Sequence, residues 1–80
     1  MNIQSKPKPM YVQKGTYRHY KTGQFYEVVG VALQTETEQQ FVIYRPLYEN
    51  CQYELFARPA DMFTEIVEVG GAKVPRFELV

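Results

Sequence analysis

Three arginines that each adjoin a proline are the residues of this sequence best suited to hold a ligand. They lie in the dipeptides Arg45-Pro46, Arg58-Pro59 and Pro75-Arg76. Proline restricts its own backbone and that of the residue before it, so these long side chains start from a relatively fixed base. A guanidinium binds carboxylate or phosphate through two parallel hydrogen bonds and stacks on aromatic rings. The pattern predicts a site for an anion or an aromatic group, with Tyr44 and Tyr48 beside Arg45.

The same arginines could instead have only a structural role on the surface of a sheet. In this alternative Arg58 pairs with Asp61 or Glu54, and Arg45 pairs with a glutamate on a neighbouring strand, while their aliphatic stems cover apolar surface. The sequence leaves both interpretations open.

The segment YRHY, residues 17–20, contains the only histidine of the chain. In a strand, Tyr17 and His19 point to one face and Arg18 and Tyr20 to the other, so the four side chains cannot contact one ligand. His19 is more typical of a hydrogen-bonded structural residue, although its titration near neutral pH leaves a pH-sensitive role open. The residues that we assign to ligand binding are His19, Tyr20, Tyr44, Arg45, Tyr48, Arg58 and Arg76.

Most enzyme signatures are missing from the sequence. Ser5 is the only serine, so a serine triad inside the fold is excluded. The sequence spacing gives no reason to expect Cys51 beside His19 as a nucleophile and its base. One cysteine and one histidine are also too few ligands for a structural zinc site. Glu36 and Glu38 lie in a polar turn where carboxylates are usually solvated, and the glycines are too scattered for a phosphate loop. We therefore expect no catalytic residue, metal or cofactor.

Composition indicates one small globular domain. The 80 residues are 45% hydrophobic and 15% aromatic, which is too apolar for a disordered chain. The single cysteine, Cys51, excludes an intrachain disulfide and suits a reducing compartment. There is no signal core and no apolar run long enough to cross a bilayer, so we expect a cytoplasmic protein without a membrane partner.

The net charge of zero hides an asymmetry along the chain. Five basic residues precede the first acidic residue, Glu27, and the first twelve residues read as a flexible tail rich in lysine and proline. Such a tail could lie on phosphates. Single-stranded nucleic-acid binding, with Tyr20, Tyr44 or Tyr48 stacking on bases, is therefore an alternative function, which the neutral total charge weakens.

Residues 13–80 have the composition and alternation of β-strands. We expect strands at residues 24–34, with a bulge at Gly30, and at 41–47, 51–57, 64–69 and 72–80, the last two joined by a hairpin at Gly70-Gly71. A single helical turn is expected at residues 60–63. The predicted fold is all-β: a small antiparallel SH3-like barrel or curled sheet of five to six strands with one short helical turn, with an OB-like barrel or an open roll as alternatives. The expected core residues are Tyr26, Val28, Val31, Val42, Leu47, Leu55, Phe56, Met62, Phe63 and Val67.

Four motifs in matching order resemble a bacterial family of unknown function, DUF1653. They are KGTYRHYKTGQFYEVVGVA, ETEQQFVIYRPLY, ARPADMF and VPRFE, and they extend from Lys14 to Glu78. The resemblance implies a small, free-standing, β-rich protein and carries no assigned activity. The residues that it highlights are Tyr17, Arg18, His19, Tyr20, Tyr44, Arg45, Tyr48, Arg58, Pro59, Arg76 and Phe77.

These observations favour a non-catalytic binding module, whose exposed tyrosines and arginines hold an anionic or aromatic small molecule or a protein segment. A small hydrolase or isomerase that uses His19 with a glutamate as acid and base is a further alternative.

Overall fold

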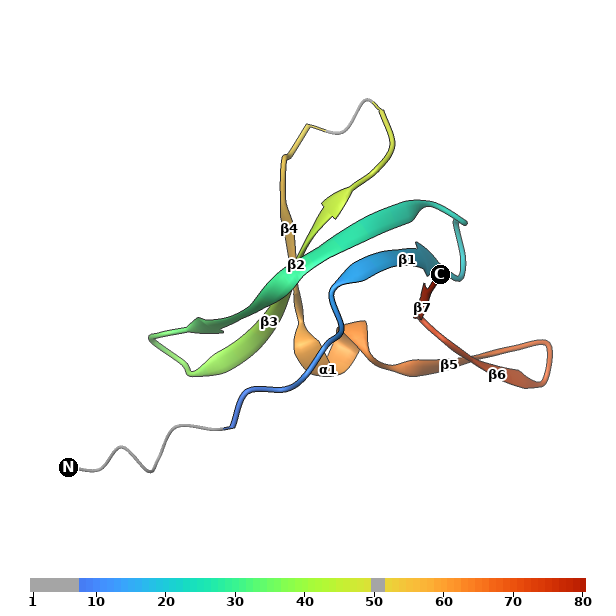
Figure 1. Ribbon diagram of the computed structural model, residues 1–80. Helices are drawn as coiled ribbons and strands as arrows, with labels where there is room; N and C mark the ends of the chain where they lie inside the picture. The colour runs from blue at the N-terminus through green and yellow to red at the C-terminus, as the bar shows by residue number, and fades with distance from the viewer. Residues whose placement is uncertain (1–7, 50–51) are drawn as a thin grey trace.

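The computed structural model describes residues 8–49 and 52–80, so Cys51 and the first seven residues of the predicted tail lie outside the described part. The chain is mainly β-structure with one helical turn (Figure 1). The strands are β1 (Gly15–His19), β2 (Phe25–Gln34), β3 (Gln39–Pro46), β4 (Phe56–Pro59), β5 (Ile66–Val69), β6 (Ala72–Pro75) and β7 (Phe77–Leu79), and the helix is α1 (Ala60–Phe63).

Five strands form one curled antiparallel sheet in the order β4-β3-β2-β1-β7, and β5 and β6 form a separate hairpin. The mainly-β prediction with one short helical turn is confirmed. Within the described residues β4 and β7 are the two edges of the sheet and do not pair with each other. Of the expected forms, the curled open sheet is therefore the one observed.

Glycine positions shape the two hairpins as the sequence predicts. The register between β2 and β3 shifts between Val28 and Gly30, which is the bulge expected from a glycine in the middle of a strand. Gly70 and Gly71 join β5 to β6 with φ values of 56° and 83°. Both values lie in the left-handed region that glycine adopts without a steric penalty.

Two of the predicted strands are corrected by the structure. The strand expected at 51–57 begins only at Phe56, because Gln52 to Leu55 are solvent-exposed and pair with no described strand. The strand expected at 72–80 is broken at Arg76, where the chain leaves the hairpin and enters the sheet. There the backbone N–H of Arg76 donates to the carbonyl of Glu65, and its own carbonyl accepts from the N–H of Tyr20, each at 2.9 Å.

The core is a cluster of aromatic rings beneath the concave face of the sheet. Phe63 and Phe77 stack with ring centroids 4.1 Å apart, and Tyr17 and Tyr44 meet Phe63 at 5.5 and 5.3 Å. The buried residues are Tyr17, Tyr26, Val28, Val42, Tyr44, Ala60, Phe63 and Phe77. Tyr26 also contacts this cluster.

The predicted core is correct for Tyr26, Val28, Val42 and Phe63, while Val31 and Phe56 are partly buried against it. It is wrong for Leu47, Leu55 and Met62, which are exposed, and Val67 is only partly buried. Alternation within one segment does not say where the strand begins or which face is covered, and this is the physical reason for the errors.

The described part of the predicted tail contacts the sheet without forming a helix or strand. The backbone N–H of Met10 donates to Oε1 of Gln40 at 2.6 Å, and Nε2 of Gln40 donates to the carbonyl of Lys8 at 2.9 Å. Val12 packs against the core.

Candidate functional site

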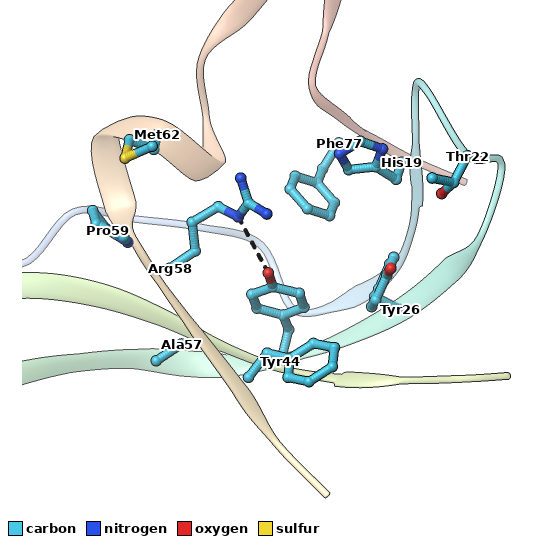
Figure 2. Close-up of a pocket in the computed structure, with 10 residues that line it drawn as sticks. His19, Thr22, Tyr26, Tyr44, Ala57, Arg58, Pro59, Met62 and Phe77 are labelled. Atoms are coloured by element: carbon cyan, nitrogen blue, oxygen red, sulfur yellow. Dashed lines mark hydrogen bonds between the residues drawn. The ribbon is translucent and has the colours of Figure 1, made fainter. Parts of the chain in front are cut away.

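A concavity of about 580 Å³ is lined by residues of the curled sheet and of α1 (Figure 2). The end of β1 and the following turn contribute one side, and β4 with the start of α1 contributes the other. Buried rings from β2, β3 and β7 lie between these sides. The lining residues are His19, Thr22, Tyr26, Tyr44, Phe56, Ala57, Arg58, Pro59, Met62 and Phe77.

Strand register places the arginine of this site on the concave face. In the β3–β4 pair, Val42 is opposite Arg58 and Tyr44 is opposite Phe56. Residues directly opposite each other in an antiparallel pair point to the same face. Because Val42 and Tyr44 belong to the core, Phe56 and Arg58 must also face inward, and β4 is a sheet edge where a long polar side chain is tolerated.

Arg58 is held by two aromatic side chains. Its Nε donates to the hydroxyl oxygen of Tyr44 at 3.2 Å, and its guanidinium carbon lies 5.3 Å from the centroid of the Phe77 ring (Figure 2). The distance to Phe77 is that of a cation–π contact. Among the described residues no carboxylate pairs with Arg58, so the pairing with Asp61 or Glu54 that the alternative interpretation required does not form.

His19 presents a neutral imidazole to the same concavity. Its Nδ1 accepts a hydrogen bond from the backbone N–H of Lys21 at 3.2 Å, so the proton of the neutral ring is on Nε2. Burial lowers the pKa of His19, and the positive charges of Arg58, Arg76 and Lys21 lower it further. Within the described part of the chain, Nε2 has no acceptor, which leaves it available as a donor.

Arg76 contributes positive charge near His19 but is already paired. Its Nη2 lies 2.8 Å from Oε1 of Glu65, whereas its Nε is buried and has no hydrogen-bond partner among the described residues. A buried donor without an acceptor costs about 1–3 kcal/mol. Arg76 is not among the residues that line the concavity.

The remaining predicted residues lie elsewhere. Arg45 faces the opposite side of the sheet and pairs with Glu27 at 3.0 Å, as the alternative interpretation expected. Tyr20 lines a separate hollow with Arg18, which pairs with Glu78. The Tyr48 hydroxyl lies 3.3 Å from that of Tyr26, outside the lining of the concavity.

The structure thus brings His19, Tyr44 and Arg58 together in the lining of the concavity. Tyr20, Arg45 and Tyr48 are not among the lining residues, although the Tyr20 ring lies 5.1 Å from that of His19. Phe56 and Phe77 were missing from the predicted site. Phe56 lies two residues before Arg58, so strand alternation could have placed the two on one face. Thr22 and Met62 come from a turn and from α1, where alternation gives no signal.

Tyr26 provides a ring rather than an ionised group. Burial raises the pKa of Tyr26 strongly, and its hydrogen bond to Tyr48 raises it further. As far as the chain is described, the lining includes no Asp or Glu side chain. Across the described ranges no three His, Cys, Asp or Glu residues are grouped as metal ligands, and no helix is long and apolar enough to span a membrane. The arrangement is suited to binding an anion beside aromatic rings.

Comparisons with known proteins agree on one family. The family model described as "Protein of unknown function (DUF1653)" matches residues 15–79. The crystal structure of a DUF1653 protein from Bordetella bronchiseptica is similar, with 35% sequence identity, a TM-score of 0.78, and coverage of 86% of this chain and 87% of that one. A search of curated proteins gave no match.

Proposed function

The chain belongs to the DUF1653 family, as its motifs predicted, and we propose that it is a non-catalytic binding module that holds the anionic group of a small molecule or protein segment at Arg58. One observation carries this proposal. The guanidinium of Arg58 is fixed by Tyr44 and Phe77, lines a concavity, and has no carboxylate partner within the described ranges.

The other arginines of the chain support this proposal by contrast. Arg18, Arg45 and Arg76 each pair with a glutamate at 3.1 Å or less. Their charges are therefore compensated within the chain, whereas no carboxylate of residues 8–49 or 52–80 compensates that of Arg58. A guanidinium already held in place loses little side-chain entropy on binding, so more of the energy of a charge-assisted hydrogen bond is available as affinity.

The electrostatic surroundings also favour an anion. His19 and Arg58 lie close enough that the arginine lowers the pKa of the imidazole, and no carboxylate from the described part of the chain lines the concavity. An anion placed there would meet positive potential and two kinds of N–H donor without displacing an existing ion pair.

A titration followed by two-dimensional ¹H–¹⁵N NMR tests the proposal. Acetate, phenylacetate, inorganic phosphate and phenyl phosphate are added separately at constant ionic strength. At least one anion should shift the amide signals around His19, Ala57 and Phe77, and the shifts should disappear in Arg58→Ala. Arg45→Ala is the matched control, because Arg45 also precedes a proline but faces away, and it should respond like the unmodified chain. Absence of any Arg58-dependent shift would refute an anion-binding role.

The two alternative functions have less support from the geometry. Tyr44, one of the rings proposed to stack on a base, is only 4% exposed. The acid–base alternative needs a glutamate beside His19, and no described glutamate lines the concavity. Short oligonucleotides added in the same titration would reveal nucleic-acid binding, which should weaken steeply with salt. The cytoplasmic location stays a prediction.

A further inference from the structure

The charge of the concavity matches a single negative charge. Among the described residues Arg58 is the one lining residue with a formal charge, because the pKa of His19 is lowered and the imidazole is neutral near pH 7. Arg76 is neutralised by Glu65, and Lys21 is solvent-exposed and outside the lining. A phosphate monoester carries about −1.5 to −2 charges at neutral pH, so part of its charge would have no counter-charge here.

The available donors match the two oxygens of a carboxylate. The Nε of Arg58 is occupied by Tyr44, which leaves the two terminal nitrogens, Nη1 and Nη2, without a partner among the described residues. A pair of parallel N–H groups is the edge of a guanidinium that binds a carboxylate in bidentate fashion. Nε2 of His19 is a further neutral donor on the same concavity.

Several of the other lining residues are apolar and suit a flat hydrocarbon group. Phe56, Pro59 and Met62 border Arg58, and Met62 is 44% exposed although it is a large hydrophobic side chain. The volume of about 580 Å³ lies within the range of small-molecule sites. Covering Met62 and Phe56 with an apolar group would remove their surface from water.

We propose, building on the anion-binding function above, that the ligand of this concavity is a monocarboxylate attached to an aromatic or similarly flat apolar group. The carboxylate binds the terminal nitrogens of Arg58, and the apolar group lies against Met62 and Phe56. This chemistry occurs both in free aromatic acids and at the carboxyl terminus of a peptide that ends in an aromatic residue.

Four probes separate the parts of this proposal when their dissociation constants are measured by the NMR titration at pH 7.5. Phenylacetate should bind at least about tenfold more tightly than each of the other three probes. Acetate lacks the apolar group, phenylacetamide lacks the charge, and phenyl phosphate lacks the carboxylate geometry. A free-acid peptide that ends in phenylalanine distinguishes the two sources, because it should bind only if the concavity accepts the carboxyl terminus of a peptide. The same peptide with a blocked carboxyl terminus is its control and should not bind.

Three variants locate the contacts. Arg58→Lys keeps the charge but loses the paired nitrogens, so it should weaken phenylacetate about tenfold or more. Met62→Gln should weaken phenylacetate and leave acetate unchanged, and because Met62 is exposed this variant should fold. Arg45→Lys should bind every probe like the unmodified chain.

The outcomes distinguish this inference from the proposed function. Phenyl phosphate binding as tightly as phenylacetate, with dependence on Arg58, would overturn the carboxylate specificity and leave the anion-binding function standing. Equal binding of phenylacetamide and phenylacetate would also overturn it. If none of the anions binds, both the inference and the proposed function are wrong.

Discussion

The Nε of Arg58 donates a hydrogen bond to the hydroxyl oxygen of Tyr44 across 3.2 Å, which joins the edge strand β4 to a buried ring of β3. The two residues are fourteen positions apart in the sequence. The bond satisfies the hydroxyl of a ring that is almost fully buried, and it fixes the orientation of the guanidinium. Stability and ligand binding should therefore be coupled at this pair.

Tyr44→Phe tests that coupling. The variant removes the acceptor of the Arg58 Nε and leaves the aromatic packing in place, so the free energy of unfolding should fall by about 0.5–1.5 kcal/mol. The affinity for phenylacetate should fall several-fold, because the guanidinium is no longer fixed. Urea denaturation and the NMR titration measure the two effects. Tyr53→Phe is the control, since Tyr53 is exposed and should tolerate the change. Equal stability and affinity in Tyr44→Phe and the unmodified chain would contradict this role.

Phe63 should be among the most sensitive positions for stability. It is buried and stacks on Phe77 at 4.1 Å, so Phe63→Ala should lower the free energy of unfolding by about 3–5 kcal/mol. Such a loss is a large part of the stability of a small domain, so Phe63→Leu should be measured beside it as a milder change. Phe25→Ala, at an exposed position, should cost less than about 1 kcal/mol. Comparable decreases in the free energy of unfolding for Phe25→Ala and Phe63→Ala would argue against the observed core.

His19 should make the stability of the domain depend on pH in a defined direction. Burial and the neighbouring Arg58, Arg76 and Lys21 lower its pKa in the folded state below the ordinary value of 6.5. The unfolded chain therefore binds the proton more readily, and the stabilising contribution is complete above about pH 6.5 and is lost as the pH falls through the folded pKa.

The variant His19→Asn should remove this pH dependence, because the Asn oxygen can replace Nδ1 as acceptor for the Lys21 N–H but does not titrate. Subtracting its thermal denaturation curves from those of the unmodified chain cancels the contribution of the carboxylates. If the difference in thermal stability between the unmodified chain and His19→Asn does not change between pH 7.5 and pH 5, His19 titrates normally and this prediction is wrong.

The β5–β6 turn should depend on its glycines, whereas the β2 bulge should not depend on Gly30. Gly71 has a φ of 83°, so Gly71→Ala should lower the free energy of unfolding by about 1 kcal/mol. Gly30 is the matched control: its backbone lies outside that φ range and a Cβ there would meet nothing within 4 Å. Gly30→Ala should be neutral or slightly stabilising, since it restricts the unfolded chain. Equal losses in the two variants, measured by urea denaturation, would reject this explanation.

The sequence by itself determined the features that depend on neighbouring residues. The density of β-branched and aromatic residues predicted strands, Gly30 predicted the bulge, Gly70-Gly71 predicted the hairpin, and Pro59 marked the transition to a helical turn. Alternation in YRHY also separated Tyr17 and His19 from Arg18, as observed, whereas Tyr20 lies in the turn after β1 with its ring 5.1 Å from that of His19. These properties follow from backbone preferences and from the geometry of a single strand.

Only the tertiary structure decided which of these residues form a site. Arg45 and Arg58 both precede a proline, yet one pairs with Glu27 on the outer face and the other lines the concavity. That difference comes from the register of β4 on β3. Likewise, Phe77 contacts His19 because β7 pairs with β1 from the far end of the chain. The register of distant strands is set by the burial of the whole core, and no local segment contains that information.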